Sequence, residues 1–227
     1  GHYAKLARSC IEQINSRGKK PILCGGAGLY FRALNSGIFD QSKSELKIRK
    51  KLEDLYDCGN AQDMMNKLKK IDPEYYMHVH INNKKRLIRA LEIYEGTGKT
   101  PSEHFKNQKN KHAPNLNLFS VYLNWDRNEL RKRISKRTTA MIKNGWIDEV
   151  KKIIEKYPGV NLHPLDSIGY RQIVSYLNNK ISLESLESEI NTKTYQYAVR
   201  QIKWFKKENM NLIIKMNSGA ITTQIVK

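Results

Sequence analysis

The sequence predicts an α/β protein that is rich in helices and carries a helical insertion in its core. The first 40 residues read as helix, short apolar strand, glycine turn and helix, which is half of an α/β unit. Strand character returns near residue 118 and again at 212–214. The stretch between has helical patterns and no strand pattern. We therefore assign 1–40 and 114–227 to the α/β core and 41–113 to the insertion.

The first helix is expected at residues 3–16, where apolar residues recur at helical spacing. Its apolar face consists of Leu6, Ala7, Cys10, Ile11 and Ile14. Gly18 is the expected stop signal. The apolar run Pro21 to Cys24 has the pattern of a parallel strand that is buried on both faces. Gly25 to Gly28 then form a turn into a second helix.

The insertion should hold several short helices, the clearest of which spans 85–95. After it the pattern alternates again between strand and helix, and two of the helices end at glycine or proline. The expected elements are strand 118–123, helix 128–143, helix 148–157, helix 182–207 and strand 212–214.

The charge balance points to a polyanionic partner. Lysine and arginine number 41 and aspartate and glutamate 22, so the net charge of the 227 residues is +19. Such a surplus neutralises phosphates and releases counterions. A lysine-rich codon usage would give the same composition, and charge does not distinguish RNA, DNA and an anionic membrane. No apolar run approaches the roughly 18 residues of a membrane span.

The three cysteines, Cys10, Cys24 and Cys58, are too few and too scattered for a disulfide framework or a zinc site. They indicate a reducing, cytoplasmic setting. His78 and His80 lie two residues apart with no third ligand nearby, so a metal site there is not expected.

Two segments carry glycines in phosphate-binding patterns. The turn Gly25 to Gly28 follows an apolar run and opens a helix, so its backbone N–H groups could converge on an anion, although a plain tight turn fits equally. Gly98-Lys99-Thr100 looks like the end of a P-loop. That motif needs a glycine at position 93, which is Ile93, and a preceding strand in place of a helix.

Basic and aromatic residues gather in three further segments. Lys84, Lys85, Arg86 and Arg89 lie on one predicted helix, where a solvated face is the plain alternative. The segment 166–172 combines a glycine, an aromatic residue and an arginine. In the last long helix Tyr197, Gln201 and Trp204 share a stripe, for which core packing is the alternative.

Taken in order, these blocks resemble the tRNA dimethylallyltransferase (tRNA isopentenyltransferase) family of the bacterial type over essentially the whole chain. Each block is weak alone, and their order and spacing carry the resemblance. The blocks are Arg17-Gly18-Lys19, Gly25 to Tyr30, Asp72-Pro73, His80, Arg86-Leu87, Arg89 to Tyr94, Thr97 to Thr100, Leu130, Arg133, Arg137, Met141, Gly145, Ile168 to Gln172, Thr194, Gln196, Tyr197, Arg200, Gln201 and Trp204.

The resemblance implies a parallel-sheet core like that of the ATP-binding P-loop kinases, incomplete in this chain, with an insertion that grips the anticodon stem-loop. It implies a prenyltransferase that moves a dimethylallyl group from dimethylallyl diphosphate to N6 of adenosine 37 in tRNA. Mg²⁺ is the implied cofactor. The base must leave the stack to reach a closed pocket. We expect a monomer that does not associate with membranes.

The resemblance also assigns roles to residues. The diphosphate would be held by Gly25, Gly26, Ala27, Gly28 and Arg171. The tRNA would be met by three segments of the chain. These are Lys85, Arg86, Leu87, Ile88 and Arg89, then Ser167, Ile168, Gly169, Tyr170 and Arg171, and then Thr194, Gln196, Tyr197, Arg200 and Gln201.

Departures from the family pattern qualify the expected activity. The family opens with a P-loop and a general-base aspartate, which we expect upstream of Gly1, so no catalytic or metal-binding residue is assigned within this chain. Ala27 stands where the family usually has a threonine that bonds the diphosphate. The 227 residues alone are therefore not expected to be competent. Two alternatives remain: a tRNA-binding protein without catalysis, and a transferase acting on free adenine nucleotide.

Overall fold

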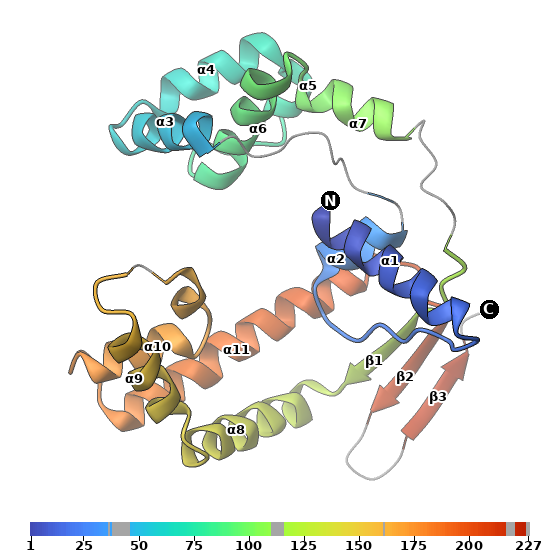
Figure 1. Cartoon of the computed structure of the whole chain (residues 1–227), viewed down its shortest axis with the longest axis vertical. Coiled ribbons are helices and arrows are strands. Elements are labelled where there is room, and N and C mark those ends of the chain that lie inside the picture. Colours follow the sequence, from blue (N-terminus) through green and yellow to red (C-terminus); the bar gives the residue numbers. More distant parts are fainter. Residues whose placement is uncertain (36, 38–45, 110–115, 161, 217–220, 226–227) are drawn as a thin grey trace. The chain divides into compact units, whose positions relative to one another are not determined.

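The computed structural model describes residues 1–35, 37, 46–109, 116–160, 162–216 and 221–225. The chain divides into two compact units, Gly1–Asn117 and Leu118–Lys227, which we call the N-terminal and C-terminal units. Helices dominate both units (Figure 1). The expected separation of 41–113 as an insertion in a core of 1–40 and 114–227 stays a prediction.

The described residues of the N-terminal unit form helices and the loops between them, with no strand among them. Its elements are α1 (His2–Ser16), α2 (Gly28–Asn35), α3 (Leu46–Asp57), α4 (Ala61–Ile71), α5 (Pro73–Tyr76), α6 (Lys84–Thr97) and α7 (Pro101–Lys109). Helix α1 ends as its sequence predicts. Gly18 takes a left-handed φ of 69°, and the amides of Gly18 and Lys19 bond back to Asn15 and Ile14.

The predicted strand Pro21 to Cys24 is wrong. Residues 19–27 belong to no helix or strand, and the side chains of Ile22 and Leu23 are 87% and 45% exposed. A strand is stable only when neighbouring strands complete its ladder of hydrogen bonds, and none of the described residues does so here. The apolar face of α1 is also only partly covered, because Ile11 is buried whereas Leu6 is 56% exposed.

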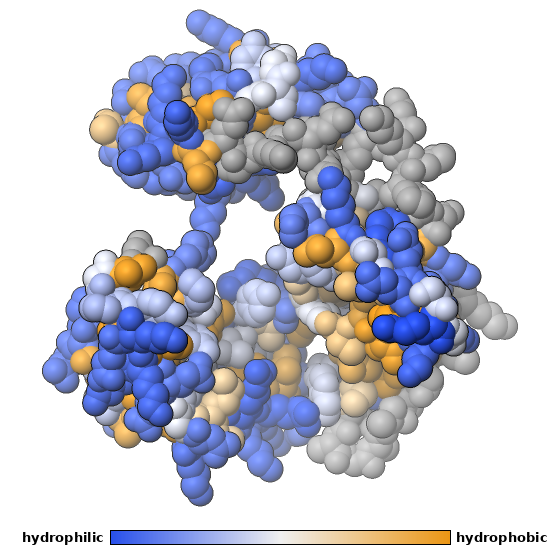
Figure 2. All heavy atoms as spheres, viewed as in Figure 1, coloured by the Kyte–Doolittle hydropathy of each residue, from blue (hydrophilic) through white to orange (hydrophobic). Residues whose placement is uncertain are grey.

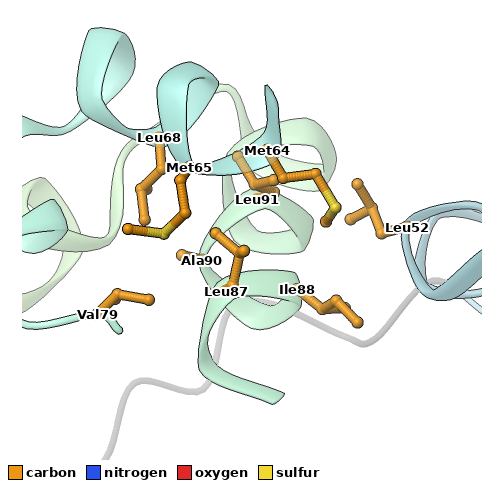
Figure 3. Packing of buried hydrophobic residues seen from close by; sticks show 9 residues of the cluster. All are labelled: Leu52, Met64, Met65, Leu68, Val79, Leu87, Ile88, Ala90 and Leu91. Atoms are coloured by element: carbon orange, nitrogen blue, oxygen red, sulfur yellow. The ribbon is translucent and has the colours of Figure 1, made fainter. Parts of the chain in front are cut away.

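Helices α3 to α6 share one apolar core, which centres on α6 (Figure 3). Asn83 caps the start of α6 by accepting from the Arg86 amide, and Gly98 ends it in a left-handed conformation. Between these caps, Leu87 and Leu91 are fully buried against the other helices. Burying each leucine stabilises the fold by about 1.5–3 kcal/mol. The core consists of Leu52, Met64, Met65, Leu68, Val79, Leu87, Ile88, Ala90 and Leu91.

The C-terminal unit combines a small sheet with four α-helices. Its elements are β1 (Val121–Trp125), α8 (Arg127–Lys143), α9 (Trp146–Lys156), the 3₁₀ turn η1 (His163–Asp166), α10 (Tyr170–Leu177), α11 (Leu183–Phe205), β2 (Leu212–Met216) and β3 (Ile221–Ile225). The sheet order is β1-β2-β3. Strands β1 and β2 pair in parallel, with Val121 opposite Leu212, so the expected parallel pairing is confirmed, whereas antiparallel β3 was not foreseen.

A second core joins α9, α10 and α11. Trp146, Val150, Ile173, Leu186 and Ile190 are its buried members. Helix α8 packs against α11 and α9. The side chain of Asp126 caps α8 by accepting from the amides of Asn128 and Glu129, and the carboxylate also suits the positive end of the helix dipole.

Candidate nucleic-acid interface

The glycine turn leads directly into α2. The Ala27 carbonyl accepts from the amides of Tyr30 and Phe31 at 2.9 and 3.1 Å, so the helix starts here. The amides of Gly28 and Leu29 come before these bonds and follow the rule that the first turn lacks intrahelical partners. The Tyr3 ring stacks on the Tyr30 ring with 4.0 Å between centroids, which holds α2 against α1. The turn thus presents a fixed helix N-terminus, where anions bind most readily.

Helix α6 separates its basic residues from its apolar residues. Lys85 and Arg86 are exposed at its first turn, and Arg89 pairs with the carboxylate of Glu92 at 2.9 Å. Glu92 is only 3% exposed, so this ion pair fixes Arg89 at the edge of the core. Most of the visible surface of α3 to α7 is hydrophilic (Figure 2). These three cations stay candidate RNA contacts.

The expectation that Leu87 and Ile88 contact tRNA is wrong. Leu87 is 0% exposed and Ile88 is 2% exposed, and both point into the core with Leu91 and Leu52 (Figure 3). A contiguous run of five residues on a helix covers more than one complete turn, so some of its members must face inward. Leu87 and Ile88 are therefore removed from the candidate interface, and their packing in the core holds the helix that carries the basic residues.

The segment 167–171 surrounds the start of α10. Gly169 has φ +94° and is buried, and its amide donates to the Gln172 side chain at 2.8 Å. A Cβ on Gly169 would lie 2.0 Å from the Trp146 ring. The Gly169 amide is therefore occupied inside the fold, which corrects its assignment as an RNA contact. Ser167 likewise donates its hydroxyl to the Pro164 carbonyl at 2.7 Å.

Tyr170 and Arg171 follow Gly169 on the first turn of α10. The Tyr170 hydroxyl donates to Glu149 at 2.6 Å, and this bond raises the pKa of the phenol. The Tyr170 ring meets the edge of Trp146 at 5.7 Å. Arg171 lies 3.5 Å from Asp166, and both side chains are more than half exposed. An exposed pair of this kind contributes little and can exchange Asp166 for a phosphate.

Sequence reasoning missed a set of arginines that lie over aromatic rings. Arg131 lies 4.2 Å from the centre of the Tyr195 ring, and Arg133 lies 4.1 Å from that of Trp125. Arg200, which was expected, stands 5.7 Å from Tyr197. Arg131 joins α8 to α11 and Arg133 joins it to β1. The sequence does place Trp125 just before α8 and Arg131 and Arg133 at the fifth and seventh positions of that helix. Which arginine lies over which ring is decided only by the fold.

The remaining site residues of α11 lie on its central turns. Gln196, Tyr197 and Arg200 are exposed, and Thr194 and Gln201 are half-buried. Gly25 to Gly28 belong to the N-terminal unit and Arg171 to the C-terminal unit, so their expected meeting at one diphosphate stays a prediction. Ile168 is half-buried and also stays a candidate.

Gly98-Lys99-Thr100 connects two helices and lacks a preceding strand. The Thr97 hydroxyl donates to the Ile93 carbonyl, and Thr100 and Glu103 exchange hydrogen bonds as a capping box for α7. These bonds show that the Gly98-Lys99-Thr100 segment ends α6 and caps the start of α7. The described residues contain no group of three histidines, cysteines or acids that could hold a metal ion, and none of their helices is long and apolar enough to cross a membrane.

An exposed helix N-terminus, arginines over aromatic rings and a basic surplus occur here in a helix-rich α/β protein, and these features suit a polyanion. The family model described as IPP transferase matches residues 1–208, and the chain belongs to this family. Relatives named tRNA dimethylallyltransferase include one from Halothermothrix orenii, 38% identical over 208 residues, with 91% of this chain and 63% of the relative covered. Another, from Bacillus mycoides, is 34% identical over 227 residues, with 99% and 70% covered.

Solved structures agree with the family assignment. A tRNA delta(2)-isopentenylpyrophosphate transferase from Staphylococcus epidermidis has a TM-score of 0.57 at 30% identity, with 94% of this chain and 69% of that chain covered. A eukaryotic dimethylallyltransferase acting on tRNA has a TM-score of 0.74 at 29% identity, with 94% and 55% covered. The chain thus spans less than two thirds of the length of some of these relatives, including the 63% of the Halothermothrix orenii protein.

Proposed function

We propose that this protein transfers the dimethylallyl group of dimethylallyl diphosphate to N6 of adenosine 37 in tRNA. The main support for this proposal is the family match over residues 1–208, together with relatives named for this activity. In this reaction the N6 nitrogen forms a bond to the allylic carbon, the bond from that carbon to the diphosphate oxygen breaks, and N6 loses a proton. Diphosphate gains charge as it leaves, so fixed positive groups lower the barrier.

The residues of this chain would act on the departing diphosphate and on the RNA. The amides at the N-terminus of α2 suit the diphosphate, because a helix end attracts anions without side-chain rearrangement. Arg171 is exposed and weakly paired, so it can turn to an incoming phosphate. Arg86, Arg200 and the arginines over aromatic rings suit the RNA backbone. No general base is assigned among the described residues.

Mg²⁺ enters this proposal only as a companion of the diphosphate. The described residues supply no cluster of ligands for it. Mg²⁺ commonly keeps several waters and binds through substrate phosphates. No step proposed for this chain runs through the metal. A cytoplasmic location belongs to the proposal too, because tRNA is the substrate and the three cysteines are free thiols.

Ala27 favours a second candidate, a tRNA-binding protein that does not catalyse transfer. Its methyl group cannot donate a hydrogen bond to a diphosphate at the exposed turn. If diphosphate departure depends on a hydroxyl at this position, Ala27→Thr should raise turnover more than it raises affinity for dimethylallyl diphosphate.

The deciding experiment supplies the full-length protein, with whatever residues precede Gly1, with labelled dimethylallyl diphosphate and either tRNA or AMP. Label on tRNA at adenosine 37 is the expected result, and Arg171→Ala should reduce it. Label on AMP alone would refute the proposed substrate. Tight tRNA binding without any product, in both the full-length protein and its Ala27→Thr variant, would favour the binding protein instead.

A further inference from the structure

A hollow of about 420 Å³ lies in the N-terminal unit, where helices α5, α6 and α7 meet. This volume falls within the range of about 300–1,000 Å³ that is typical of small-molecule sites. A second hollow, along α3, is lined by a single helix and the residue after it, so it has no opposing wall. The α5–α7 pocket is lined by Glu74, Tyr75, His78, Arg86, Ser102, Phe105 and Lys106.

The floor of the pocket is rigid. Asp72 is 3% exposed, and its carboxylate accepts from the amide of Tyr75 at 2.9 Å and from the amide and hydroxyl of Ser102 at 2.8 and 2.7 Å. One buried carboxylate therefore ties the start of α5 to the start of α7. Ser102, Phe105 and Lys106 are spaced three and four apart, so they line one face of α7. The pocket exists before any ligand arrives.

Two aromatic rings form the apolar wall of the pocket. The ring centroids of Tyr75 and Phe105 are 5.8 Å apart, with an angle of 41° between the planes. Tyr75 is half-buried, and burial raises the pKa of its phenol. Phe105 is 42% exposed and leaves part of its ring open to the pocket side. A flat, open aromatic face suits a stacked base, because every base offers a π-face.

The polar wall carries both signs of charge. Arg86 is exposed on the first turn of α6. Lys106 pairs with Glu74 at 2.6 Å, and this contact raises the pKa of the lysine. Glu74 offsets part of the attraction of Lys106 for an anion, so Arg86 is the cation of this wall better suited to meet a phosphate. The arrangement fits one phosphate beside one flat ring, which is the chemistry of a nucleotide.

We propose that the α5–α7 pocket holds one unpaired nucleotide of the bound RNA, with its base on Phe105 and its phosphate at Arg86. This inference rests on the proposed function and names a second place where the RNA is gripped, away from the modified adenosine. An unpaired nucleotide is required because a duplex hides its base faces in the stack. The pocket therefore reads the loop and not the stem.

The test compares binding of a labelled anticodon stem-loop RNA with binding of a fully paired duplex made from the same stem. Phe105→Ala should weaken stem-loop binding by about 5- to 150-fold, the range for one lost base–aromatic stack. Duplex binding should change less than about twofold, because a paired duplex places no base on the Phe105 ring. Phe119→Ala is the matched control, since Phe119 is an exposed phenylalanine of the other unit. Equal effects of Phe105→Ala on stem-loop and duplex would overturn the inference.

Two further substitutions at Phe105 separate stacking from folding. Phe105→Tyr keeps a ring and should bind the stem-loop as the parent chain does. Phe105→Leu keeps apolar bulk without a ring and should bind as weakly as Phe105→Ala, with its melting temperature unchanged. Full affinity of Phe105→Leu would show that the ring does not hold a base.

Glu74→Gln supplies a test with the opposite sign. It frees Lys106 and removes a negative charge, so stem-loop binding should tighten by about 1.5- to 5-fold, the scale of an exposed ion pair. Unchanged or weaker binding would contradict a phosphate at this wall. A separate measurement tests binding of AMP to the parent chain. If AMP binds the pocket while Phe105→Ala leaves stem-loop binding unchanged, the pocket takes a free nucleotide and the inference fails.

The two proposals fail in different ways. Transfer of the dimethylallyl group to tRNA by a Phe105→Ala chain that binds tRNA normally would refute the pocket and leave the proposed function standing. Selective loss of stem-loop binding in Phe105→Ala, in a protein that forms no prenylated product, would support the pocket and refute the activity.

Discussion

Replacing Gly169 by alanine should destabilise the C-terminal unit strongly. A Cβ at this position would lie 2.0 and 2.3 Å from two carbons of the Trp146 ring, far inside contact distance. The backbone φ of +94° is also a conformation that side chains with a Cβ rarely adopt. The positive φ contributes about 1–2 kcal/mol and the forced repacking of a core tryptophan about 1–3 kcal/mol.

Together these two contributions predict that Gly169→Ala loses about 2–5 kcal/mol in unfolding free energy. Urea denaturation followed by tryptophan fluorescence measures this loss. Gly159→Ala is the control. Gly159 has φ +71° with nothing within 4 Å of its would-be Cβ, so it reports the backbone cost alone. Gly169→Ala should therefore lose more stability than Gly159→Ala, because the overlap with Trp146 adds to the cost of a positive φ.

Trp146→Phe removes the atoms that overlap and should return part of the stability lost in Gly169→Ala, as measured by a double-mutant cycle. Tyr170 and Arg171 start the next helix turn, so Gly169→Ala should also weaken RNA binding. A Gly169→Ala protein as stable as Gly159→Ala would refute this account of the α10 start.

Asp72→Ala removes the acceptor of three hydrogen bonds and should reduce the unfolding free energy by about 2–4 kcal/mol, with Asp72→Asn intermediate; chemical denaturation measures both. Burial lowers the pKa of His104, so the folded protein binds fewer protons than the unfolded chain. Stability should fall as pH drops below about 6.5, and His104→Gln should flatten that dependence in denaturation curves taken across this range. Arg133→Ala should reduce the salt dependence of tRNA binding by about one counterion, whereas Lys132→Ala, next to it, should change the slope less. Equal slopes for these two variants would contradict a special role for the arginine over Trp125.

The sequence predicted elements whose signals are local. Helix α6 was predicted at 85–95 from its repeating apolar face, and the structure confirms it as Lys84–Thr97. The cap residue Asn83 and the left-handed Gly98, which set its bounds, are local signals too, but they were not used in the prediction. The strand expected at Pro21 to Cys24 failed because an apolar run reports only a preference for burial. Whether it becomes a strand depends on neighbours that the run itself does not encode.

Site residues were harder to predict than elements for the same reason. Leu87 and Ile88 lie between the basic residues Arg86 and Arg89 in sequence, but on the opposite side of the helix. The α5–α7 pocket has no sequence signature at all. Phe105 meets Tyr75 across 30 residues because Asp72 joins Ser102 to the start of α5, a contact that only the fold creates.

The surplus of positive charge is not equally available to RNA. Lysines such as Lys84, Lys106 and Lys132 face carboxylates at 2.5, 2.6 and 2.9 Å, so a negative charge beside each one offsets part of its attraction for a phosphate. Arginines such as Arg131 and Arg133 lie over aromatic rings, which attract a cation without bringing an opposite charge beside it. Packing on the ring also holds the guanidinium in place, so less side-chain freedom is lost when RNA binds. For this reason the arginine–aromatic pairs, and not the more numerous lysines, should dominate the electrostatic part of RNA affinity.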